Sequence, residues 1–261
     1  MSQTEDPVPD HAAFRGGAAS RSRLTLLGFA LALLFALALA ISGPGHRFGL
    51  WDWRTGITIL KWAAYGGIGA ASVSLLGAVL ARPGGGRRGF IFALLGVVIG
   101  LAVTAIPWQM KRTARAVPPI HDITTDSENP PRFKALLPLR AGAPNPAVYG
   151  GAGIAIQQLR AYPDIVPAIL ALSPAQAFER ALATARDMGW TVVEADKAAG
   201  RIEATDRTLW FGFVDDVVIR ITPAAGSGSR VDVRSLSRVG RSDLGTNAKR
   251  IRAFLARLKG G

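Results

Sequence analysis

The sequence contains no cysteine and only three histidines among its 261 residues. The absence of thiols excludes a disulfide framework, a thiolate nucleophile and a zinc site built on cysteine. Histidine is the side chain best suited to proton transfer at neutral pH, but His11 and His46 lie in an expected polar tail and an expected membrane loop. Only His121 therefore remains as a candidate base for a folded domain.

Two motifs of common enzyme classes are also missing. The chain has neither a G-x-S-x-G nucleophile elbow nor a glycine-rich phosphate loop, and its Gly226–Ser229 stretch is typical of a hairpin turn. The formal net charge is +13, yet residues 1–115 hold 12 of the 31 basic residues against four acids, so most of the excess flanks apolar segments. No aromatic platform accompanies the other basic residues, which argues against nucleic acid as a partner. The sequence thus disfavours an enzyme and predicts no cofactor.

Hydrophobic residues make up 49% of the chain and gather in three runs at about residues 24–41, 57–81 and 90–108. Each run is close to the roughly 20 residues that cross a hydrocarbon core, which predicts a three-helix transmembrane bundle. The polar residues 1–23 have no apolar face and are expected to form a disordered cytoplasmic tail. The first run is longer than a signal-peptide core, so an uncleaved anchor is expected, with a cleaved signal peptide as the alternative.

The short loops predict the orientation of these helices. Six arginines lie in the tail and the second loop, against two in the first loop, and positive charge favours the cytoplasmic side. The N-terminus is therefore expected inside and the C-terminal domain in the periplasm, anchored to the inner membrane. The expected partners are the lipid bilayer, a further membrane protein, and an anionic lipid or envelope polymer that the basic C-terminal region would attract.

Nine of the 16 prolines lie in residues 109–167, which predicts an extended segment that links or wraps the next domain. Residues 168–261 begin with a capping-box signature at Ser173, followed by apolar residues at helical spacing. Four runs of strand character come next, and an amphipathic helix begins near Asp243. The pattern predicts a two-layer α+β domain, with an antiparallel four-stranded sheet, two helices on one face and the other face solvated.

The run Arg238–Gly245, between the last strand and the last helix, is the strongest candidate for a binding site. Helix N-termini present free backbone N–H groups that favour anions, and two arginines add charge-assisted hydrogen bonds. The glycines let the backbone turn, and a serine or aspartate caps the helix, although the Asp243 carboxylate competes with an anion for the same N–H groups. The alternative is a structural junction with solvated or ion-paired arginines. The candidate residues are Arg238, Gly240, Arg241, Ser242, Asp243 and Gly245.

Alternation along the third strand places Asp215 on the side that faces the core. A charge there needs a partner such as Arg238, Arg241 or the backbone, so we expect Asp215 to brace the structure. The opposite side carries Asp216 and Arg220 with other charges of both signs, and it is expected to be a solvated surface.

The acid-rich run from His121 to Pro131 offers a weak alternative site for a hard metal ion. Its carboxylates are Asp122, Asp126 and Glu128, but their spacing matches no calcium loop. Turns before proline explain the same residues. We therefore predict no metal at this position.

Several separated sequence blocks resemble, in the same order, those of a protein family found in bacteria and plants and catalogued as domain of unknown function 1499. The blocks are HDITTDSENPPRF, AYPDIVP, FVDDVVIRI and VDVRSLSRVGRSDLGTNAKRI, and the matching portion runs from about Ile120 to Leu258. The resemblance implies an envelope-associated domain that often follows membrane segments. It supplies no catalytic residues.

Two functions of different classes follow from these observations. The first is a membrane-anchored binding or scaffolding domain in the periplasm that engages an anionic envelope component through the Arg238–Gly245 junction. The second is an envelope hydrolase that uses His121, Asp122 and Asp215, with or without a metal ion. The hydrolase requires those three side chains to converge, whereas the binding domain requires only that the junction be open.

Overall fold

The computed structural model describes residues 22–83 and 89–260, and these fall into two compact units. The first unit comprises the residues up to Ala36 together with Tyr65–Val103, and the second comprises Leu37–Ala64 and Thr104–Gly261. Most of the predicted N-terminal tail lies outside the described residues.

Among the described residues, three helices are long and apolar enough to cross a membrane: α1 (Arg23–Arg47), α2 (Trp53–Leu80) and α3 (Phe90–Ala116). This confirms the number of candidate spans. Each helix is longer than its apolar run, and α3 continues past Pro107 into the proline-rich region. Within the first unit the helices pack closely through glycine, since a Cβ atom at Gly28 would lie 2.4 Å from Ser74 Oγ.

The sheet of the second unit contains the four predicted strands, which pair antiparallel in sequence order. It also contains two strands of three residues each, both paired with the last long strand, so the predicted count of four is wrong. Three residues are too few for an alternating pattern, and proline excludes interior strand positions while leaving an edge pairing open. The strands are β1 (Asp122–Thr124), β2 (Ala168–Leu170), β3 (Thr191–Asp196), β4 (Arg201–Arg207), β5 (Val214–Pro223) and β6 (Ser229–Ser237).

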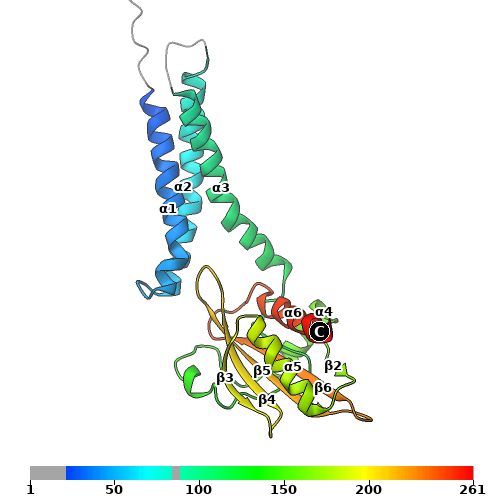
Figure 1. The fold of residues 1–261 in the computed structure, drawn as a ribbon. Helices are drawn as coiled ribbons and strands as arrows, with labels where there is room; N and C mark the ends of the chain where they lie inside the picture. The colour runs from blue at the N-terminus through cyan, green and yellow to red at the C-terminus, as the bar shows by residue number, and fades with distance from the viewer. Residues whose placement is uncertain (1–21, 84–88, 261) are drawn as a thin grey trace, which may run out of the picture. The chain divides into compact units, whose positions relative to one another are not determined.

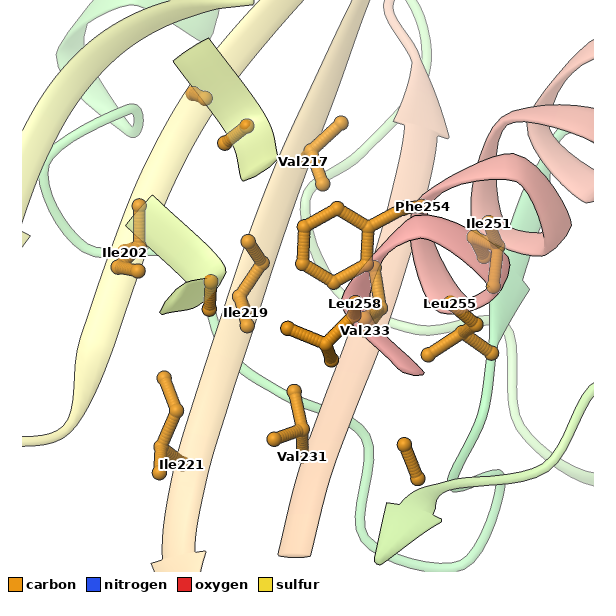
Figure 2. Packing of buried hydrophobic residues seen from close by; sticks show 14 of the residues in the cluster. Ile202, Val217, Ile219, Ile221, Val231, Val233, Ile251, Phe254, Leu255 and Leu258 are labelled. Atoms are coloured by element: carbon orange, nitrogen blue, oxygen red, sulfur yellow. The ribbon is translucent and has the colours of Figure 1, made fainter. Parts of the chain in front are cut away.

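Figure 1 labels the helices α5 (Pro174–Asp187) and α6 (Thr246–Gly260). Both contribute to one apolar cluster with alternate residues of the sheet (Figure 2). The predicted capping box is present, because Ser173 Oγ accepts a hydrogen bond from the Gln176 N–H. On α6, Phe254 is fully buried and stacks on Trp190 with ring centroids 5.3 Å apart. Burial of each large side chain in this cluster stabilises the fold by about 1.5 to 3 kcal/mol.

The proline-rich region is folded against the same sheet. It includes β1, a 3₁₀ turn η1 (Pro138–Arg140) and helix α4 (Ala152–Ala161). The backbone N–H groups of Lys134 and Leu136 donate to the two carboxylate oxygens of Glu203 on β4, at 2.8 and 2.9 Å. Leu136 also packs in a small apolar cluster with strand residues. We call residues 126–149 the covering segment, because they bury one face of the sheet.

The expectation of a solvated charged face is therefore wrong. Glu203, Asp216 and Asp232 have no exposed surface, and Arg234 is 2% exposed. Each charge has a partner of opposite sign or backbone donors; for example, Arg234 binds both oxygens of Asp122 at 2.9 and 2.8 Å. The sequence alternation correctly assigns these residues to one face, but it contains no information on whether a distant segment covers that face.

Candidate functional site

The junction between β6 and α6 is a tight loop with an unusual backbone. Gly240 and Gly245 have φ angles of 90° and 79°, which glycine adopts without strain. Leu244 has a φ angle of 55° and is the one described non-glycine residue with a positive value. Such a conformation costs about 1 to 3 kcal/mol, so the surrounding structure must hold it.

Asp243 occupies the N-terminus of α6. Its carboxylate oxygens accept hydrogen bonds from the Gly245 N–H at 2.8 Å and the Asn247 N–H at 2.7 Å. Burial raises the pKa of Asp243, while those two N–H groups act in the opposite direction. The carboxylate thus sits where an anion at the helix N-terminus would bind.

The two arginines of the junction have different environments. Arg238 is committed to the fold: its Nη2 and Nε donate to the two oxygens of Asp216, at 2.8 and 2.9 Å, and its Nη1 donates to Leu139 O. Arg241 is exposed, and within residues 22–83 and 89–260 its guanidinium has no hydrogen bond or ion pair. Of the candidate pair, only Arg241 offers a free cation to a ligand.

The buried Asp215 is held by Arg250 of α6, not by either arginine of the junction. Arg250 Nη2 donates to the Asp215 carboxylate at 2.7 Å, and its Nε donates to Asp206 at 2.7 Å. Burial alone would lower the pKa of Arg250, but Asp215 and Asp206 outweigh this effect and raise it. The partner of Asp215 is therefore neither of the predicted arginines, Arg238 and Arg241, and its bracing role stays a prediction. The signal was available, because Arg250 lies on the apolar stripe of α6 beside Ile251 and Phe254.

The residues of the hydrolase hypothesis have other contacts. His121 Nδ1 lies 3.2 Å from Arg241 O. Asp122 is paired with Arg234, and Asp215 is paired with Arg250. None of the hydrogen bonds found within the described ranges joins two members of this triad.

The acid-rich run forms turns and ion pairs. Asp126 Oδ1 accepts from the N–H groups of Glu128 and Asn129, and its other oxygen accepts from Arg220 and Arg230. No group of three histidine, aspartate or glutamate side chains in the described part of the chain is arranged to hold a metal ion.

A mainly apolar pocket of about 340 Å³ opens beside the junction, within the second unit. Sequence reasoning missed it, because its walls come from segments far apart in the chain. Its polar lining includes Asp215 and Asp243, both already bonded to protein groups. The apolar walls include Trp53, Ile57, Met110, Phe211, Phe213 and Leu244.

Aromatic residues form much of one wall. Three of them, Trp210, Phe211 and Phe213, belong to the loop from Thr208 to Phe213, between β4 and β5, and Trp53 lies at the start of α2. Phe211 and Phe213 stack with their ring centroids 5.1 Å apart, and Trp53 meets Phe213 edge-on at 6.5 Å. This arrangement suits an apolar group, whereas the paired carboxylates leave no charge inside the pocket to attract an anion.

A family model described as "Protein of unknown function (DUF1499)" matches residues 122–258, from the first residue of β1 to the last turn of α6. No curated protein matches the chain. The matched region includes the covering segment and the Arg238–Gly245 junction, and it spans more than half of the chain. In this protein the matched region follows the three apolar helices α1, α2 and α3. The chain therefore belongs to the DUF1499 family.

Proposed function

We propose that the protein is a membrane-anchored binding protein of the cell envelope, whose domain faces the periplasm and holds an anionic amphiphile. The observation that carries the proposal is the apolar pocket of about 340 Å³ beside Arg241, an exposed side chain with no hydrogen-bond or ion-pair partner in the described part of the chain. Its volume lies near the lower end of the ~300 to 1,000 Å³ found for small-molecule pockets.

The charges around the pocket indicate how such a ligand would lie. Asp215 is neutralised by Arg250, and Asp243 is bonded to backbone N–H groups, so neither attracts a cation strongly. An anionic group inside would meet two carboxylates, which disfavours that orientation. The apolar part of the ligand would therefore enter the pocket, and its anionic head would stay outside near Arg241.

The basic C-terminal region supports an anionic head group. This region, residues 238–261, contains seven basic residues. Three of them are paired with carboxylates: Arg238, Arg250 and Arg252. The other four are available for long-range attraction to an anionic surface or ligand: Arg241, Lys249, Arg257 and Lys259.

Binding is favoured over hydrolysis because the acids of the hydrolase hypothesis are used internally. Asp122 and Asp215 each accept hydrogen bonds from a buried arginine, so both carboxylates already have a partner within the domain.

Photocrosslinking of the full chain in lipid vesicles tests the proposal. The probe is a phosphatidylglycerol that carries a diazirine in its acyl chain, diluted into phosphatidylcholine. A crosslink is expected on the peptide that contains Leu244, besides those on the membrane spans. Val239→Trp, which fills the pocket, should abolish the Leu244 crosslink and leave the span crosslinks unchanged, whereas Ser227→Trp on the exposed β5–β6 turn should change neither.

Arg241→Gln separates head-group binding from apolar binding. It should weaken the Leu244 crosslink with the phosphatidylglycerol probe and not with the matched phosphatidylcholine probe. Arg257→Gln, which removes an exposed cation from α6, is the matched control. If the Leu244 crosslink is absent, or survives Val239→Trp, the pocket does not hold a lipid chain.

A further inference from the structure

The β4–β5 loop, Thr208–Phe213, is apolar although it lies at the surface. Leu209 is 88% exposed, more than any other large apolar side chain among the described residues. Its neighbours Trp210, Phe211 and Phe213 are turned toward the protein and make ring contacts with one another. An isolated exposed leucine is ordinary, but this one projects from a rigid aromatic loop.

The loop is attached to the end of α1, within the second unit. The Arg47 guanidinium donates to Leu209 O, and Trp210 Nε1 donates to Ala40 O at 3.4 Å. Gly43 makes this position available to the indole ring, since a Cβ atom there would lie 2.5 Å from Trp210 Cδ1. The loop is therefore fixed beside the last two turns of α1.

It is also seated on the first turn of α2. Phe211 is buried against Gly56, where a Cβ atom would lie 2.9 Å from its ring. Phe213 packs near His46 and Trp53, with centroid distances of 5.6 and 6.5 Å. These contacts hold Leu209 in a defined direction instead of leaving it on a free loop.

The length of α1 places this loop at a membrane boundary. At 1.5 Å per residue, about 20 residues cross a hydrocarbon core of about 30 Å, so a span that starts at Leu24 ends near Gly43. Trp210 lies between Ala40 and Gly43, at the depth where indole rings gather in membrane proteins. Phe48 and Leu50, in the adjoining α1–α2 connection, are 75% and 73% exposed.

We propose that the Thr208–Phe213 loop is an interfacial membrane anchor, and that Leu209 inserts into the lipid leaflet that surrounds the C-terminal end of α1. The bilayer is the partner because the loop is bonded to a membrane span at the depth of the interface, and Arg47 lies beside it where lipid phosphates are found. Insertion does not require a ligand in the pocket, so the inference stands apart from the proposed function.

The absence of native cysteine makes a site-specific test direct. Three single-cysteine variants of the full chain, Leu209→Cys, Leu37→Cys and Ser227→Cys, are labelled with the environment-sensitive dye NBD and reconstituted in phosphatidylcholine–phosphatidylglycerol vesicles. Leu37, an exposed residue within the apolar part of α1, is the membrane reference, and Ser227, in the exposed β5–β6 turn, is the aqueous reference. Each label is then challenged with a nitroxide attached to lipid acyl chains and with iodide in the buffer.

The label at Leu209 should show a blue-shifted emission, loss of fluorescence with the lipid nitroxide and protection from iodide, as at Leu37. The label at Ser227 should show the reverse. Iodide quenching at Leu209 equal to that at Ser227 would overturn the inference. Protection from both quenchers would also overturn it and would indicate that protein covers the loop.

Discussion

Replacement of Asp216 by asparagine should destabilise the domain more than any change to an exposed ion pair. The Asp216 carboxylate is fully buried on β5 between Arg140 of the covering segment and Arg238 of the junction. Burial lowers the pKa of Arg140, and Asp216 opposes this effect. The amide would remove the negative charge and leave Arg140 as a buried cation without a counterion.

The expected magnitude follows from this geometry. Loss of one partner of a buried pair costs about 3 to 5 kcal/mol, because the remaining charge stays desolvated. A domain of this size loses about 4 °C of thermal midpoint per kcal/mol, so the midpoint should fall by about 12 to 20 °C. Glu179→Gln is the matched control, since it breaks an ion pair with Lys197 in which both side chains are more than half exposed. The control should cost only about 0 to 1 kcal/mol.

The assay is thermal unfolding of the purified full chain in one detergent at one heating rate, followed by tryptophan fluorescence. Hydrogen exchange adds local information, because the amides of the covering segment should exchange faster in Asp216→Asn. Asp216→Leu combined with Arg140→Met should recover much of the lost stability, since buried pairs are replaceable by apolar groups of similar volume. Equal midpoints for Asp216→Asn and Glu179→Gln would refute the reasoning.

Two other predictions concern titration and topology. Burial, reinforced by Asp122, raises the pKa of Tyr149 from 10.0 to about 12. Because the folded protein disfavours the phenolate, the contribution of neutral Tyr149 to the free energy of unfolding should be complete below pH 10. It should be lost as the pH rises from 10 toward 12. An ultraviolet phenolate titration should then lose its last step in Tyr149→Phe, and an unchanged curve would contradict the assignment. For topology, a reporter that is active only in the cytoplasm, fused after Lys259, should be silent; activity in an intact, membrane-inserted chain would reverse the predicted orientation.

The long elements were predictable because each carries its own local signal. The capping box at Ser173 and the alternating patterns of β3 to β6 depend on residues adjacent in sequence. The strands β1 and β2 carry no such signal, because each consists of three residues that are extended only through pairing with β6. Local patterns therefore predicted the four long strands, β3 to β6, and missed the two short strands that pair with the outer side of β6.

The position of the Arg238–Gly245 junction in the fold was predictable, but its contacts were not. The glycine-rich junction before α6 was found from turn and helix-capping residues, and Asp243 caps the helix there. Arg238 was assigned to a ligand, whereas it binds Asp216, a carboxylate on the sheet face thought to be solvated. The aromatic wall of the pocket was missed because Trp53 and Phe213 are separated by 160 positions in the chain, and no local pattern relates them.

The covering segment also constrains the order in which the domain can fold. It is synthesised before every long strand that it covers. Just before it in the chain, Asp122 of β1 forms an ion pair with Arg234, 112 positions later. Contacts so distant in sequence close large loops, which slows folding and keeps unpaired surface exposed for longer. Until β6 has been made, the carboxylate of Asp122 and the N-terminal edge strand have no partner. A chain that stops before Ser229 would therefore remain an open, protease-sensitive intermediate. The strand β1 can be completed only when β6, the last strand of the sequence, has been made.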